Sequence, residues 1–143
     1  MPLVQLIYIS QPTGPIGSHE LIQIVDSCRR NNEKSGITGM LAFSGDYFLQ
    51  LIEGPEEAIS GTFGRIERDP RHAQIHVLAR QCVAQRAFGT WNMGFAGINA
   101  FNDDLVTASL GTSEIDRDAL GADKALALLT ALAQRSGASR AAA

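Results

Sequence analysis

The first candidate for chemistry in this chain is a glutamine in the middle of an apolar run. Gln50 lies within Tyr47-Phe48-Leu49-Gln50-Leu51-Ile52-Glu53, whose composition favours a β-strand. Because side chains alternate along a strand, Gln50 shares one face with Phe48 and Ile52, and apolar residues also fill the opposite face. We expect such a strand to be buried on both sides, where an amide needs hydrogen-bond partners to offset its desolvation. Something polar must therefore meet Gln50.

Two further polar side chains stand out because of the elements that carry them. Tyr8 belongs to a predicted first strand, Leu3 to Ile9, where a tyrosine is most often a core residue with a locally satisfied hydroxyl. Asn32 follows the apolar stripe of a helix predicted from about His19, so its amide lies at the end of a buried face. The alternative is that Asn32 only ties up carbonyls at the end of its own helix. The segment alone leaves both interpretations open.

The elements that position these residues follow one another in a regular order. We expect Ser18 to cap the first helix, and Ser44-Gly45-Asp46 to close a hairpin of strands 37–43 and 47–53. A second helix should have Pro55 at its first position. The remaining predicted elements are strands at 74–81 and 88–95 and helices at 105–110 and 122–132.

Two pairings within these elements have ordinary structural interpretations. Arg65 and Asp69 are four residues apart near the end of the second helix, which Asp69-Pro70 terminates, and could form a surface pair. In the fifth strand Trp91 and Met93 would share a face with Phe95, which is normal core composition.

The order strand, helix, strand, strand, helix, strand, strand predicts an α+β sandwich of ferredoxin-like type. Its five-stranded mixed sheet would carry two helices on one face, with the C-terminal helices in addition. In this topology Tyr8 and Gln50 come from strands that can lie side by side, and Asn32 comes from the helix that crosses between them. The three side chains could then converge between the two helices, a place that suits a planar ligand with polar edges.

Composition limits the class of protein. The 143 residues carry a formal charge of −3, with 45% hydrophobic and 19% charged residues, as in a soluble single domain. The negative charge argues against sequence-independent nucleic-acid binding. No apolar run approaches the roughly 18 residues of a membrane span, and two cysteines are too few for a disulfide framework. We expect a cytoplasmic protein that binds neither nucleic acid nor membrane.

Several spaced motifs in roughly the first hundred residues resemble the BLUF domain, the FAD-binding fold of blue-light sensors. They are Tyr8, Asn31-Asn32, Gly36-Ile37-Thr38-Gly39-Met40-Leu41, Phe48-Leu49-Gln50-Leu51-Ile52-Glu53-Gly54-Pro55, Asp69-Pro70-Arg71-His72 and Trp91-Asn92-Met93. The resemblance implies that residues 1–98 form a flavin-binding photosensory domain. Residues 99–136 would be a helical extension packed on the sheet or at an oligomer interface, and residues 137–143 a flexible tail.

The resemblance also implies a binding mode, with the isoalloxazine ring of FAD between the two helices. Ile24 and Ile66 would sandwich the ring, while Asn32 and Arg71 would bond to its carbonyl edge. The other residues implied in flavin contacts are Asn31, Phe48, Gln50, Arg65, Asp69 and His72. The chain has no glycine-rich phosphate loop of the dinucleotide-fold type, which is consistent with a different mode of FAD binding.

The mechanism that the resemblance implies starts with light. An electron would pass from Tyr8 to the excited flavin and a proton would move through Gln50, leaving the flavin unchanged inside a different hydrogen-bond network. An amide suits this role because its two ends are an acceptor and a donor, although rotation and tautomerisation both remain open. Trp91 or Met93, competing for a place near Gln50, would carry the change onward.

Two positions depart from the family pattern. Cys28 stands where serine is common, which replaces a hydroxyl near the switch by a weak thiol donor. Asn92 stands where serine is frequent in the tryptophan-x-methionine motif, and we expect little consequence.

Three other interpretations are compatible with parts of the sequence. An acylphosphatase-type enzyme would need a phosphate-binding loop, but the loop from Gln11 to Gly17 has no arginine. A metal site could use His72 and His76, but they follow the helix-ending Pro70 and have no obvious third ligand. A light-independent interaction module would have all of these polar side chains satisfied locally.

We therefore expect a photoreceptor that is not an enzyme and that signals by association. The C-terminal leucines exceed what so short an appendage can bury in itself, which favours a homo-oligomer and a downstream partner protein.

Overall fold

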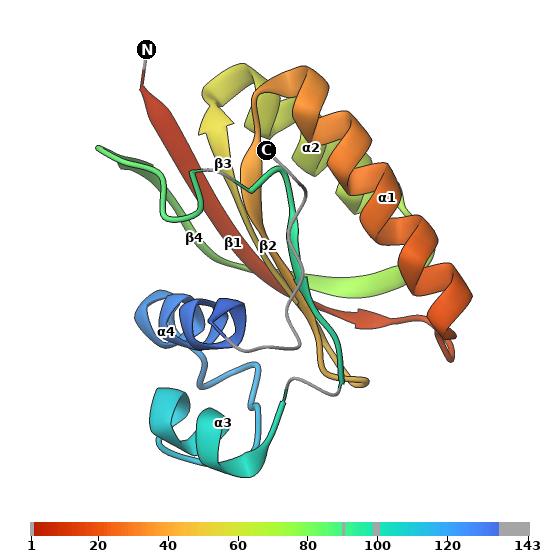
Figure 1. Ribbon diagram of the computed structural model, residues 1–143, viewed down its shortest axis with the longest axis vertical. Helices are drawn as coiled ribbons and strands as arrows, with labels where there is room; N and C mark the ends of the chain where they lie inside the picture. The colour runs from red at the N-terminus through yellow and green to blue at the C-terminus, as the bar shows by residue number, and fades with distance from the viewer. Residues whose placement is uncertain (1, 90, 99–100, 135–143) are drawn as a thin grey trace.

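The computed structural model describes residues 2–89, 91–98 and 101–134 (Figure 1). Five strands form one sheet in the order β4-β1-β3-β2-β5. Their bounds are β1 (Leu3–Pro12), β2 (Thr38–Phe43), β3 (Phe48–Pro55), β4 (His72–Val83) and β5 (Gly94–Ala96). Neighbouring strands are antiparallel except β2 and β5, which are parallel. The mixed sheet of the predicted α+β ferredoxin-like fold is confirmed.

In the described part of the chain, four α-helices cover the two faces of this sheet, as Figure 1 shows. Helices α1 (Ser18–Ser35) and α2 (Glu56–Arg68) lie on one face, and α3 (Asp103–Leu110) and α4 (Ala122–Ala133) lie on the other. The predicted tail 137–143 lies outside the described residues. Among the described helices, none has the length and apolar composition needed to cross a lipid bilayer.

The central strand β3 separates two hydrophobic cores. Phe48 and Ile52 pack with residues of α1 and α2, whereas Leu49 and Leu51 pack with residues of α3 and α4. The strand is buried at every position from 48 to 54, so the expectation of two-sided burial is confirmed. Alternation along β3 therefore gives each face its own set of side chains.

The C-terminal leucines belong to the second core. Leu128, Leu129 and Leu132 are 0% exposed in the cluster that covers the sheet. Their apolar surface is thus buried within the chain itself, at about 1.5–3 kcal/mol for each side chain. The excess of leucine that suggested an association surface is explained by packing on the sheet.

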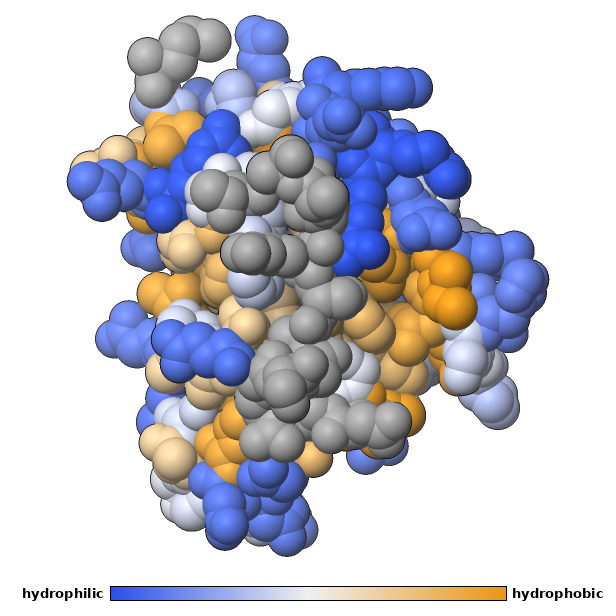
Figure 2. Space-filling model, viewed as in Figure 1, coloured by the Kyte–Doolittle hydropathy of each residue, from blue (hydrophilic) through white to orange (hydrophobic). Residues whose placement is uncertain are grey.

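The outer surface of the described chain is largely polar. Figure 2 shows hydrophilic side chains over the upper part of α1 and a hydrophobic patch beside the helix at mid-height. The exposed large apolar side chains among the described residues are Ile22 on α1, Val77 on β4 and Ile98. Most apolar side chains are therefore in the two cores.

The hairpin is confirmed, but two helix starts differ from the prediction. The turn brings Ser44 N to within 3.0 Å of Tyr47 O. Helix α1 has Gly17 at its N-cap, so Ser18 is the first helical residue and not the cap. Pro55 is the N-cap of α2 rather than its first residue, because its extended backbone still pairs with Leu3 at the end of β3.

The fifth strand is shorter than predicted. Only Gly94–Ala96 pair with β2. Before them the chain turns, with Trp91 N donating to Phe88 O at 3.1 Å. As a result Trp91 packs on the C-terminal helix side of the sheet, while Met93 is buried on the α1 and α2 side. The prediction that these two side chains share a face was wrong, because the residues before 94 are not a strand.

Candidate functional site

A cavity of about 310 Å³ lies between α1 and α2, above the sheet. Its volume is near the lower end of the range of about 300–1,000 Å³ that is usual for ligand pockets. The residues predicted for the flavin site all line it, together with Tyr8: Ile24, Asn31, Asn32, Phe48, Gln50, Arg65, Ile66, Asp69, Arg71 and His72. Trp91 and Met93 are not part of this lining.

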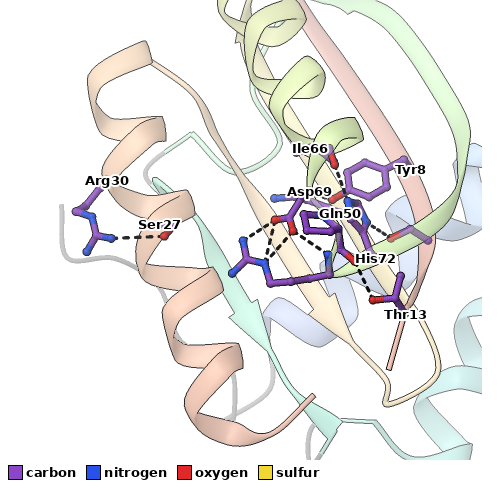
Figure 3. Close-up of polar contacts among 11 residues, drawn as sticks. Tyr8, Thr13, Ser27, Arg30, Gln50, Ile66, Asp69 and His72 are labelled. Carbon is purple, nitrogen blue, oxygen red and sulfur yellow. Dashed lines mark hydrogen bonds and ion pairs between the residues drawn. The ribbon is translucent and has the colours of Figure 1, made fainter. Parts of the chain in front are cut away.

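At the cavity wall the hydroxyl of Tyr8 donates to the side-chain carbonyl of Gln50 (Figure 3). The two residues are directly opposite in the antiparallel pairing of β1 and β3. Gln50 Nε2 in turn donates to Met93 Sδ at 3.5 Å. The three side chains are 3%, 3% and 0% exposed, so they form a buried polar row. The polar partner that the sequence required for Gln50 is Tyr8, and the residue next to the amide nitrogen is Met93, not Trp91.

Burial fixes the protonation of the groups in this row. The pKa of Tyr8 is raised well above its ordinary value, first by desolvation and then by Cys28 and Asp69. The phenol is therefore neutral and keeps its proton for the bond to Gln50. Burial also raises the pKa of the Cys28 thiol, while a hydrogen bond with Gln50 opposes that shift. The amide nitrogen of Gln50 thus has a thioether sulfur, a weak acceptor, as its partner.

The open side of the cavity carries an ion pair. Arg71 Nε donates to both carboxylate oxygens of Asp69, at 2.9 and 3.0 Å, and the Arg71 backbone N–H adds a bond of 2.9 Å. These bonds lower the pKa of Asp69, and the same pairing raises the pKa of Arg71. The spacing of Arg65 and Asp69 suggested a surface pair. In the structure Arg65 instead donates to Thr62 Oγ1 at 3.2 Å.

His72 is held by protein groups at both ring nitrogens. Nε2 lies 2.7 Å from the carbonyl of Ile66, and Nδ1 lies 2.7 Å from Ser10 Oγ. Because a backbone carbonyl can only accept, Nε2 carries a proton, and in the neutral ring Nδ1 accepts from the serine hydroxyl. The His72 ring meets the Phe48 ring edge-on, with the two ring centroids 6.1 Å apart. Among the described residues, no group of three or more histidine, cysteine or acidic side chains could hold a metal ion.

The structure separates two roles for Asn32. Its backbone carbonyl accepts from Gly36, which ends α1 in a left-handed conformation, and from Ile37 at 3.0 Å. Its side-chain Nδ2 instead donates to Asn92 O at 2.8 Å, and the residue lines the cavity. The amide therefore does not merely tie up carbonyls of its own helix. It also fixes the chain just before Met93.

Four lining residues were not predicted as flavin contacts: Ser27, Cys28, Leu41 and Thr62. Three of them could have been found from helical spacing. Residues 24, 27, 28 and 31 recur on one face of α1, and residues 62, 65 and 66 recur on one face of α2.

The lining is suited to a planar ring with polar edges. Ile24 on α1 and Ile66 on α2 supply apolar surface from the two helices, while Asn32, Gln50 and Arg71 supply hydrogen-bond donors. A cavity of about 310 Å³ accommodates a ring system rather than a whole dinucleotide. The residues present thus fit the ring of a flavin.

Comparison with known proteins identifies the family. The profile of BLUF, "Sensors of blue-light using FAD", matches residues 3–94, and the chain belongs to this family of flavin-based light sensors. The curated relatives include the blue light- and temperature-regulated antirepressor BluF of Escherichia coli K12, which is 34% identical over 115 residues. That match covers 78% of this chain and 28% of the antirepressor.

The photoactivated adenylate cyclase subunit beta of Euglena longa is also 34% identical, over 86 residues, which are 60% of this chain and 10% of the cyclase subunit. The chain therefore spans only a small part of these relatives. Within the family, the acylphosphatase-type and light-independent interpretations are not favoured.

Two solved structures show how far the similarity extends. The dark-state structure of the BLUF protein BlrB is 31% identical with a TM-score of 0.67, covering 77% of this chain and 80% of BlrB. The ground state of BlsA is 25% identical with a TM-score of 0.77, covering 94% and 90% of the two chains. The similarity to BlsA thus continues beyond the 3–94 match into the C-terminal helices.

Proposed function

We propose that this chain is a blue-light receptor that binds FAD in the cavity between α1 and α2. The buried row of Tyr8, Gln50 and Met93, of which Tyr8 and Gln50 line the cavity, is the observation that carries the proposal. Ile24 and Ile66 would contact the faces of the ring, while Asn32 and Arg71 would donate to its carbonyl edge. The other proposed flavin contacts are Asn31, Phe48, Gln50, Arg65, Asp69 and His72.

A bound flavin would supply the absorption of blue light and a site that takes up an electron. Tyr8 would give that electron, and its phenol proton already points at the carbonyl oxygen of Gln50. Loss of an electron makes a phenol strongly acidic, so the proton can pass to Gln50. Return of both to Tyr8 would leave the side chains in a new arrangement without net chemistry.

The two ends of the Gln50 amide determine what that arrangement can be. In the present geometry the oxygen accepts from Tyr8 and the nitrogen donates to Met93 Sδ. Tautomerisation would leave a single proton on the nitrogen that faces Met93, whereas rotation would turn the carbonyl oxygen toward the thioether. Because a carbonyl oxygen and a thioether sulfur can both only accept, Met93 loses its bond to Gln50 on rotation. Met93 directly precedes β5, and its displacement would reach the strand next to β2.

We propose that residues 1–98 are the photosensory domain and residues 99–136 a helical extension that receives this signal. The output would be association, with a second copy or a partner protein, rather than catalysis. In the curated relatives the matching segment is a small part of a longer protein, an antirepressor or a cyclase subunit. We place the protein in the cytoplasm, with no nucleic-acid or membrane partner.

The absorption spectrum of the purified protein, before and during blue illumination, tests the sensor function. We expect a flavin spectrum that shifts reversibly to the red, and no shift in Gln50→Leu, which keeps the volume but removes the amide. Mass spectrometry of the released cofactor should give FAD. A protein that stays colourless after reconstitution with FAD, or a Gln50→Leu variant that shifts like the wild type, would overturn the proposal.

Light scattering after size-exclusion chromatography tests the self-association. We expect a mass above the 15.3 kDa of one chain in at least one of the dark and illuminated states. A mass of one chain in both states contradicts a homo-oligomer.

A further inference from the structure

The carboxylate of Glu53 is the most completely enclosed acidic group next to the photosensory row. Glu53 is 0% exposed and lies on β3, three residues beyond Gln50 and on the opposite face of the sheet. Its Oε1 accepts from the backbone N–H of Phe88 at 2.7 Å, and its Oε2 accepts from that of Ala87 at 2.9 Å. Two such bonds to an anionic group hold the donating backbone strongly and with a defined direction.

Side chains from the two neighbouring strands complete the surroundings of this carboxylate. Gln5 Nε2 on β1 lies 3.4 Å from Oε2, and Thr38 Oγ1 on β2 lies 3.5 Å from Oε1. Arg86 donates to the backbone carbonyls of Glu53 and Gly36 and to Thr38 Oγ1, at 2.9–3.1 Å. The turn at residues 86–88 is therefore bound to β3 by the side chain of Arg86 and by the backbone N–H groups of Ala87 and Phe88.

Further contacts hold the backbone between Phe88 and β5. Trp91 N donates to Phe88 O at 3.1 Å, and the two rings are in contact with centroids 5.8 Å apart. Trp91 O accepts from Gly39 N of β2 at 3.0 Å. Gly94 lies so close to the Trp91 ring that an added Cβ would be 2.1 Å from it. The backbone at residue 91 is thus fixed from both sides.

The last two residues before β5 are bound to α1. Asn32 Nδ2 donates to Asn92 O at 2.8 Å, and Arg29 Nε donates to Met93 O at 2.9 Å. With the chain held at 87–88, 91 and 92–93, the side chain of Met93 has its sulfur at Gln50 Nε2. Gln50 and Glu53 thus bind the two ends of the same connection from opposite faces of one strand.

We propose that Glu53 is a positioning residue of the light switch, which sets the place of the β4–β5 connection so that Met93 meets Gln50. This inference rests on the proposed function, because Met93 matters only if Gln50 is the switch. Glu53 does not line the cavity and touches no group in the photosensory row. A purely structural role would lower stability but leave the photocycle of the folded protein unchanged.

The test compares the rate of dark recovery after illumination in Glu53→Gln, Met93→Ala and the double variant. Glu53→Gln keeps the shape but offers one acceptor oxygen, so one of the two backbone N–H groups loses its partner. We expect Glu53→Gln to change the recovery rate about threefold or more, in the direction of Met93→Ala. The double variant should recover like Met93→Ala, because both substitutions act through one contact.

Leu110→Ala is the matched control. It removes a buried side chain of α3, in the C-terminal core, and should lower the melting temperature while recovery stays as in the wild type. A folded Glu53→Gln protein with wild-type recovery overturns the inference, and so does a double variant in which the two effects multiply. Failure of the proposed function is distinguishable, because the wild type would then show no light-induced shift at all.

Hydrogen exchange in the wild type keeps the inference testable if Glu53→Gln does not fold. The amides of Ala87 and Phe88 should exchange as slowly as the paired amides of β3. Fast exchange at these two positions would show that the carboxylate does not hold the connection, and would overturn the inference.

Discussion

The two faces of β3 carry polar side chains of opposite character. On the cavity face, Gln50 has one strong partner, the Tyr8 hydroxyl, while its amide nitrogen donates to the sulfur of Met93. On the other face, Glu53 receives two short bonds from backbone N–H groups. Both side chains are buried, so burial alone does not decide how firmly a polar group is held.

The difference lies in the acceptors and donors that surround each group. A carboxylate is the same at both ends, so turning it exchanges nothing, and its backbone donors cannot move without breaking the connection. An amide has two different ends, and exchange of its ends costs little where the nitrogen faces only sulfur. One strand thus combines an adaptable polar group with a fixed one, and the connection to β5 is bound to both.

The largest expected effect comes from removing the strong partner on the adaptable side. Tyr8→Phe deletes the hydroxyl that donates to Gln50, so we expect the light-induced red shift to vanish while flavin stays bound. Difference spectra of dark and illuminated protein measure this. Tyr47→Phe is the matched control, since Tyr47 packs on the opposite face and should leave the shift intact. A full red shift in Tyr8→Phe would show that the switch does not need the Tyr8 hydroxyl.

The second prediction tests the fixed side through stability. Glu53→Ala leaves the backbone N–H groups of Ala87 and Phe88 without their acceptor, and that of Phe88 is buried, which should lower the free energy of unfolding by about 2–4 kcal/mol. Urea denaturation gives the value. Gln81→Ala serves for comparison, because Gln81 is exposed and donates to Gln5, and its cost should stay within about 0.5 kcal/mol. Equal costs for the two variants would mean that Glu53 is not an anchor.

The third prediction concerns Met93, which contacts Gln50 and belongs to the connection that Glu53 holds. Met93→Leu keeps the apolar volume but removes the sulfur acceptor, so stability should change by less than about 1.5 kcal/mol. The red shift should persist, because the bond of Tyr8 to Gln50 remains, while the dark recovery rate should change about threefold. Met40→Leu, a fully buried methionine on the opposite face, should recover at the wild-type rate. Identical recovery in both variants would show that sulfur at position 93 is irrelevant.

The smallest expected effect lies at the open side of the cavity. Hydrogen bonds from Arg71 hold the pKa of Asp69 below its ordinary value. This pairing therefore stabilises the folded protein above the unfolded pKa of about 4, and the stability is lost as the pH falls through the lower folded pKa.

The side chains of Arg71 and Asp69 are 41% and 25% exposed, so the contribution should stay below about 1 kcal/mol. Melting temperatures measured between about pH 5 and pH 2 should fall more steeply in the wild type than in Asp69→Asn. Parallel curves would contradict a role of the pair in stability.

Much of this architecture could be predicted from local pattern. Alternation in β3 predicted that Gln50 is buried beside Phe48 and Ile52, and the topology placed Tyr8 on the neighbouring strand, because both depend on periodicity and chain order. The boundary between β3 and α2 was harder to predict from the sequence. Pro55 fits the first position of a helix by its sequence, but pairing with Leu3 keeps it in the sheet.

The connection before β5 could not be predicted, because its conformation is decided by distant partners. Residues 88–93 have strand composition. The side chains of Glu53, Asn32 and Arg29 nevertheless bond to backbone groups of this segment, so only Gly94–Ala96 pair in the sheet. The side of the sheet that Trp91 and Met93 each occupy follows from that turn. No local pattern encodes it.

Hydrogen exchange of the flavin-loaded protein in darkness and under continuous blue light tests the central claim most directly. If Gln50 is the adaptable group and Glu53 the fixed one, illumination should speed exchange at Gly94–Ala96 and leave Ala87 and Phe88 as slow as in darkness. Gln50→Leu should show no difference between the two conditions. Equal acceleration at both ends of the connection, or none at β5 in a protein whose spectrum shifts, would contradict the account.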